Sequence, residues 1–156
     1  MSINDYLIDH EAVDWGKVLT TWHWLLPREF TVWLMNRFGD LFIVFDDGTV
    51  HVLDVGAGTL EKVAESREDF REKIDQPGQA NNWLMIPLVD SLVTAGLRPA
   101  AGECYSYRQL PVLGGDYTVE NTVLKAIALH YAAFGPIHKR IKDLPDGTPV
   151  RFKIEP

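Results

Sequence analysis

The 156-residue chain has almost no cysteine, because Cys104 is the only one. A single thiol excludes an intrachain disulfide and any metal site built on several thiolates, and it fits a reducing compartment. The sequence also lacks the run of roughly 18 apolar residues that a membrane span requires, since Pro87, Asp90 and Gly96 interrupt the apolar stretch 84–97. Its first residues have no basic region followed by an apolar one. We therefore expect a cytoplasmic protein without a membrane span.

Basic residues are the minority of the charged side chains. The sequence has 15 Lys and Arg against 22 Asp and Glu, which gives a net charge of −7. An acidic surface repels the phosphate backbone, so we do not expect direct binding to nucleic acid. The same charge speeds the encounter with a basic partner, although solubility alone also accounts for it.

Recognisable catalytic and cofactor motifs are missing as well. His130 and His138 would lie about 12 Å apart along a predicted helix, which is too far for them to share a metal ion. No serine lies in a nucleophile elbow, and Gly56-Ala57-Gly58 lacks the other residues of a phosphate-binding loop. We interpret Cys104 as a small buried apolar residue. The sequence therefore predicts no catalytic residue, no cofactor-binding residue, no metal ligand and no enzymatic activity.

Residue periodicity in the first half of the chain predicts one helix followed by strands. The helix covers 11–26, has Asp9 as a possible cap and ends at Pro27. Apolar and β-branched runs predict strands at 30–38, 41–45 and 49–55, joined by tight turns that contain Gly and Asp. These strands form an antiparallel meander. The segment after it, 59–66, is either a short strand or a first helical turn.

Helices and strands alternate in the second half. A capping box at Ser66 begins a helix at 66–74, and Pro87 is expected to kink a second, buried helix at 80–94. The remaining predicted elements are strands 103–108 and 117–125, a helix at 128–141 bent or restarted at Gly135-Pro136, and a strand at 150–154. The predicted fold class is α+β. It is a single domain, 1–156, with a largely antiparallel sheet (the N-terminal meander plus C-terminal strands) packed against several helices.

Several short motifs together resemble one bacterial family. They are Leu26-Pro27, Phe38-Gly39-Asp40, Asp47-Gly48, Gly114-Gly115, Glu120-Asn121 and Leu144-Pro145-Asp146-Gly147. With them the sequence resembles, from about Val13 to Phe152, the C-terminal domain of type VI secretion DNase-immunity proteins. The resemblance implies an antidote that binds and blocks the nuclease domain of a cognate toxin. Some relatives have an additional N-terminal domain, which we expect to be absent here.

A basic toxin domain would contact acidic side chains and exposed aromatic ones. Trp24 is rotated away from the helix face that Trp15 and Trp22 share, so it is a candidate interface hot spot. The full set of predicted partner-binding residues is Asp9, Glu11, Asp14, Trp24, Asp46, Asp47, Glu65, Glu68 and Glu72.

Two other functions remain open from the sequence. The first is a small-molecule-binding or enzymatic domain with a pocket lined by Tyr105, Tyr107, His130 and Tyr131. A deep cavity with convergent polar groups would favour this function, and a filled core would exclude it. The second is a structural adaptor that has no toxin partner.

Overall fold

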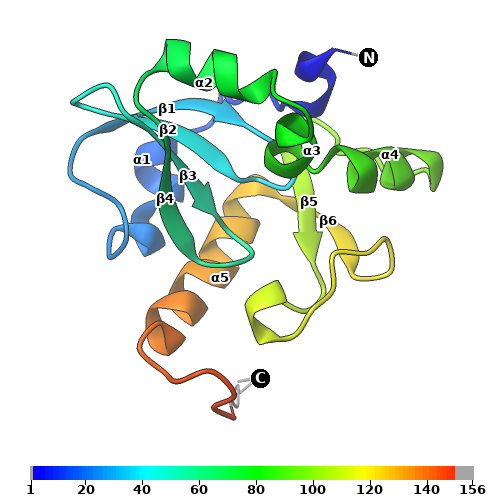
Figure 1. Cartoon of the computed structure of the whole chain (residues 1–156). Helices are drawn as coiled ribbons and strands as arrows, with labels where there is room; N and C mark the ends of the chain where they lie inside the picture. The colour runs from blue at the N-terminus through cyan, green and yellow to red at the C-terminus, as the bar shows by residue number, and fades with distance from the viewer. Residues whose placement is uncertain (1, 150–156) are drawn as a thin grey trace.

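The computed structural model describes residues 2–149, which form two antiparallel sheets surrounded by helices (Figure 1). The larger sheet is a meander whose four strands pair in chain order: β1 (Phe30–Met35), β2 (Leu41–Phe45), β3 (Val50–Asp54) and β4 (Thr59–Ala64). The smaller sheet pairs β5 (Glu103–Tyr107) with β6 (Thr122–Ala126). The predicted α+β class is confirmed, and the segment left open at 59–66 is a strand over Thr59–Ala64.

The helices are mostly short. They are α1 (Trp15–Val18), α2 (Arg67–Ile74), α3 (Gln79–Leu84), α4 (Ile86–Thr94) and α5 (Ile127–Ile141), with 3₁₀ turns at Ile3–Tyr6, Thr20–Trp22 and Pro111–Leu113. α2 begins where the capping box predicts, because Ser66 Oγ accepts a hydrogen bond from Asp69 N at 3.0 Å. The Asp69 carboxylate accepts from Glu65 N at 2.8 Å, one residue before the cap.

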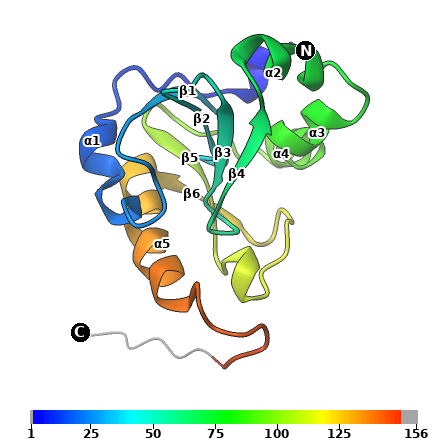
Figure 2. The same cartoon turned by 60° about the vertical axis from the view of Figure 1, so that its left-hand side comes forward.

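The meander lies between two groups of helices (Figures 1 and 2). On one face, Phe42 packs against Phe70 of α2 and Trp83 of α3, with ring centroids 5.1 and 6.0 Å away. On the other face, α5 forms hydrogen bonds to the sheet: Tyr131 Oη donates to Gly39 O, and His138 Nε2 donates to Val55 O at 2.7 Å. Aromatic contacts therefore hold α2 and α3 against the sheet, and hydrogen bonds to the carbonyls of Gly39 and Val55, just outside β2 and β3, attach α5 to it.

The helix predicted at 11–26 is wrong. α1 has four residues and is capped by Asp14, and a 3₁₀ turn follows it. Thr20 Oγ1 donates to Lys17 O at 2.7 Å, and Trp22 Nε1 donates across the molecule to Tyr131 O at 3.0 Å. These side-chain bonds take the place of continued helical ones. Trp24 is half-buried and stacks on Trp22 with ring centroids 6.1 Å apart, so it is not a freely exposed residue.

The helix predicted at 80–94 is also wrong, because it is two helices. Met85 separates α3 from α4 with a left-handed backbone, φ 53°, and Pro87 lies in the first turn of α4 instead of kinking a longer helix. Proline disfavours the helical conformation of the residue before it and is itself favoured in a first turn. The pair is not buried all round, since Asp90 and Ser91 are exposed.

The other element predictions differ less from the structure. β1 ends before the predicted 38 and β6 begins after the predicted 117, while α5 continues through Gly135 and Pro136 without a restart. The strand predicted at 150–154 lies outside the described residues.

Gly135 allows α5 to cross close to the Thr20–Trp22 turn. A Cβ at this position would lie 2.6 Å from Thr21 O and 2.9 Å from Trp22 Nε1. We expect Gly135→Ala to lower the free energy of unfolding by about 1–3 kcal/mol, because overpacking outweighs the better helix propensity of alanine. Thermal unfolding followed by circular dichroism measures this. Gly16→Ala in α1 is the control, since its nearest atom is 3.6 Å away; equal melting temperatures for the two variants would contradict the prediction.

Candidate functional site

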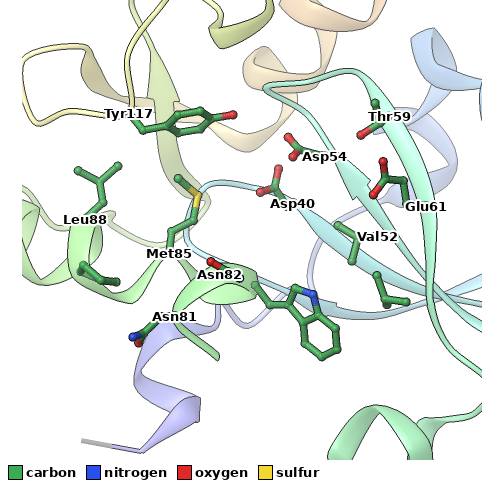
Figure 3. A pocket seen from close by; sticks show the side chains of 13 residues that line it. Asp40, Val52, Asp54, Thr59, Glu61, Asn81, Asn82, Met85, Leu88 and Tyr117 are labelled. Carbon is green, nitrogen blue, oxygen red and sulfur yellow. The ribbon is translucent and has the colours of Figure 1, made fainter. Parts of the chain in front are cut away.

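A cleft of about 500 Å³ separates the β3–β4 half of the meander from the α3–α4 pair (Figure 3). One wall comes from the meander and the other from helices α3 and α4 and the loop before β6. The meander wall consists of Asp40, Val52, Asp54, Thr59, Glu61 and Val63, and the other wall of Asn81, Asn82, Trp83, Met85, Pro87, Leu88 and Tyr117. Figure 3 shows the carboxylates on one side, with Met85 and Leu88 opposite and the Tyr117 hydroxyl directed toward Asp40 and Asp54.

Strand alternation explains why carboxylates line the cleft. Val52 and Asp54 are two residues apart, so they lie on the same face of β3, and Val52 pairs with Glu61 across β4. On β2 this face is apolar, because Phe42 pairs with Val52 and packs beneath Phe70. The face of the sheet that is apolar at Phe42 therefore carries the carboxylates of Asp54 and Glu61 on β3 and β4, where it lines the cleft.

Asp40 and Asn36 form a buried hydrogen-bond network at the base of the cleft. Asp40 is 7% exposed, and its carboxylate accepts bonds from Val55 N at 2.9 Å and Asn36 Nδ2 at 3.2 Å. Asn36 Oδ1 accepts from the backbone N–H groups of Phe38 and Asp40, both at 3.0 Å. Asn36 Nδ2 also donates to Trp83 O at 3.0 Å. The network thus joins the β1–β2 turn to the end of β3 and the end of α3.

The cleft has a negative field. Burial raises the pKa of Asp40 well above its usual range, and the neighbouring Asp54 carboxylate raises it further. Burial, Asp54 and Asp40 together raise the pKa of Tyr117 to about 12. The lining includes no lysine, arginine or histidine to compensate these acids.

The predicted acidic contacts do not form one surface. Asp46 and Asp47 lie on the β2–β3 turn, and Glu65 follows β4 at the same end of the sheet, because Val50 pairs with Ala64. Glu68 and Glu72 extend this group along α2 and are exposed. We call Asp46, Asp47, Glu65, Glu68 and Glu72 the sheet-end acids.

The remaining predicted contacts lie elsewhere. Asp9, Glu11 and Asp14 are exposed in the segment that follows the bridge between Leu7 and Asn36, near the end of β1 where the meander turns. None of the predicted contacts lines the cleft.

Sequence reasoning missed the cleft although it noticed part of it. In the sequence, Asp40 belongs to a predicted turn, and Asp54 lies just before Gly56-Ala57-Gly58. Neither position by itself indicates a binding site. The alternation of Val52 with Asp54 indicates a shared face. Glu61 joins that face only if 59–64 is a strand paired with β3, and the local sequence leaves this undecided.

The pocket predicted around Tyr105, Tyr107, His130 and Tyr131 is wrong, because these side chains are at most 2% exposed and fill the core. The Tyr105 hydroxyl donates to Leu97 O, and His130 Nδ1 lies 2.8 Å from Ser106 Oγ. Cys104 is buried, as predicted, and burial raises the pKa of its thiol.

Residues 2–149 contain neither a group of metal-binding side chains nor a helix that could span a membrane. Within this part of the chain, His, Cys, Asp and Glu side chains nowhere form a group of three or more that could hold a metal ion. None of the described helices has the length and hydrophobicity needed to cross a bilayer.

Residues 64–138 match the family model described as "T6SS immunity protein Tdi1, C-terminal". No curated protein matches the chain. The resemblance seen in the sequence is therefore confirmed over just under half of the chain, from the end of β4 to α5. The matched segment contains the α3–α4 wall of the cleft and Tyr117, whereas Asp40, Asp54 and Glu61 precede it.

We predict that Asn36→Ala destabilises the fold strongly. It leaves Phe38 N, Asp40 N and one Asp40 oxygen without their partner, and an unsatisfied buried group costs roughly 1–3 kcal/mol. We expect the free energy of unfolding, measured by urea titration, to fall by about 3 kcal/mol or more. Asn82→Ala, at an exposed position of the same cleft, is the control. A loss for Asn36→Ala as small as that for Asn82→Ala would show that the network is not a structural requirement.

His130 makes stability depend on pH. Burial, with Lys125 nearby, lowers the pKa of this imidazole from 6.5 to about 3. Below pH 6.5 the unfolded chain binds a proton that the folded protein does not, so stability decreases as the pH falls toward 3. The loss attributable to His130 is about 2 kcal/mol between pH 7 and pH 5.

His130→Asn tests this dependence. The stability advantage of the wild type over the variant should shrink by about 2 kcal/mol between pH 7 and pH 5, as measured by urea titration at each pH. A constant difference between the two proteins would contradict the assignment.

Proposed function

We propose that this protein is an immunity protein that binds a secreted toxin and occludes it, because residues 64–138 match the model of the C-terminal domain of a type VI secretion immunity protein family. The family match is the observation on which this proposal rests. The proposed partner is a cognate toxin with a basic nuclease domain, and the protein acts as a DNase inhibitor.

The placement of the reactive side chains supports a role that needs no catalysis. Burial raises the pKa of the Cys104 thiol, which disfavours the nucleophilic thiolate. Burial also lowers the pKa of both His130 and His138, whose ring nitrogens lie within hydrogen-bond distance of Ser106 Oγ and Val55 O. These side chains contribute to the core, and an inhibitor that covers its target needs none of them for chemistry.

The surface charge supports a basic partner. The net charge of −7 repels nucleic acid, so the protein is proposed to contact the nuclease and not its DNA. The sheet-end acids, together with Asp9, Glu11 and Asp14, are exposed in two separate regions. We keep them as the residues that speed the encounter with a basic domain by electrostatic steering.

The compartment and the domain organisation follow from the same proposal. A nuclease toxin reaches DNA in the cytoplasm, so its inhibitor is proposed to act there. The lone thiol, Cys104, suits a reducing compartment. Residues 1–156 are proposed to act as one domain, because the described sheets and helices share one hydrophobic core.

Coexpression tests the proposal. We expect the protein to restore growth of cells that express the toxin encoded by a neighbouring gene, and to copurify with that toxin. The pull-down uses a catalytically inactive toxin in a nuclease-treated lysate, so that DNA cannot bridge the two proteins. Cells without the immunity gene provide the control for toxicity. Toxicity that persists in the presence of the protein, together with no copurification, would reject the proposed function.

A further inference from the structure

We propose that the cleft between the meander and the α3–α4 pair receives one arginine or lysine side chain of the toxin, with its cationic end against Asp54 and Glu61. The inference rests on the proposed function and adds to it the place and the chemistry of one contact. It concerns acids other than the exposed ones expected from the sequence.

The carboxylates of the cleft are available to a cation. Asp54 is half-buried and Glu61 is exposed, and neither forms an ion pair with any other described residue. One Asp54 oxygen accepts a bond from Ala57 N at 3.0 Å. Asp40 lies behind them and is fixed by its own hydrogen bonds. Two acids without a basic partner thus face the same cleft, and the partial burial of Asp54 strengthens its attraction for a positive charge.

The shape of the cleft favours an amphipathic side chain over an inorganic ion. No three carboxylates within residues 2–149 are grouped closely enough to hold a metal ion. Opposite the acids, Met85, Leu88 and the ring of Tyr117 form an apolar wall. An arginine or lysine side chain has both parts, since its methylene stem packs on apolar surface while its charged end reaches polar groups.

The dimensions and the Tyr117 ring are consistent with this occupant. The cleft volume of about 500 Å³ leaves room for a long side chain together with water. Tyr117 lines the cleft, is 49% exposed and packs edge-on against Tyr107 with ring centroids 5.9 Å apart. A guanidinium or ammonium group that passes this ring gains a cation–π contact as well.

The network beneath the cleft makes the site rigid. Asn36 links Asp40 to Trp83 O, so the sheet wall and the helix wall are held at a fixed separation. A cleft that is already open requires little reorganisation when a side chain enters, and this increases affinity.

The experiment compares two double variants that change the net charge equally. Asp54→Asn with Glu61→Gln neutralises the cleft, and Glu29→Gln with Asp75→Asn neutralises two exposed acids that lie outside both the cleft and the predicted contacts and form no ion pair with a described residue. Binding to catalytically inactive toxin is measured by biolayer interferometry at physiological salt, and thermal melts establish that each variant is folded. We expect the cleft variant to bind at least about tenfold more weakly, mainly through faster dissociation, and the control variant to bind within about twofold of the wild type.

A double-mutant cycle then identifies the entering side chain. Each lysine and arginine of the toxin is changed in turn to alanine and measured against both the wild type and the cleft variant. One toxin residue should lose affinity with the wild type but lose little more with the cleft variant, because its partner is already removed.

The outcomes separate this inference from the proposed function. Equal losses for the two double variants would indicate a general charge effect and overturn the cleft contact. Wild-type affinity for the folded cleft variant, or the absence of any coupled toxin residue, would also overturn it while leaving the immunity role intact. Toxin that does not bind the wild-type protein would instead reject the proposed function itself.

Discussion

The buried pair of Asn36 and Asp40 is the interaction on which the rest of this structure depends. Burying a carboxylate is costly, and the hydrogen bonds from Val55 N and the Asn36 amide offset part of that cost. Both donors and the acceptor of Asn36 are in use. Because one of these bonds reaches Trp83 O, the end of α3 is fixed to the edge of the meander. The cleft lies beside this contact between α3 and the meander.

The composition of the cleft reflects a compromise between stability and recognition. Val52, Asp54 and Glu61 share the face of the sheet that Phe42 makes apolar beneath α2. Leucine or valine at the acidic positions would extend the core and gain roughly 25 cal/mol for each Å² of apolar surface buried. The chain instead keeps two carboxylates there without a compensating base. Such an arrangement forgoes that apolar burial and leaves two acids facing the cleft, as expected of a surface that binds a cation.

Much of the fold was predictable because its signals are local. The meander follows from glycine-containing turns such as Asp47-Gly48, and the start of α2 follows from Ser66 and Asp69. The predictions that failed concern segments whose conformation depends on contacts with distant parts of the chain. Trp22 leaves the helical path to donate to Tyr131 O, more than a hundred residues away, and no periodicity near Trp22 contains that information. The acid cleft was missed for the same reason, since it requires the pairing of Val52 with Glu61 and the position of α3.

The two walls of the cleft come from different parts of the chain, and this bears on how partners are distinguished. The segment that matches the immunity family contributes Met85, Leu88 and Tyr117, which offer apolar contact to any long side chain. The charges that select a cation, Asp54 and Glu61, come from strands that precede the matched segment. The two walls thus come from different stretches of this chain, one inside the matched segment and one before it. Affinity for a long side chain and preference for its charge are therefore separable, and changes in β3 and β4 can alter the preferred partner while the helices stay the same.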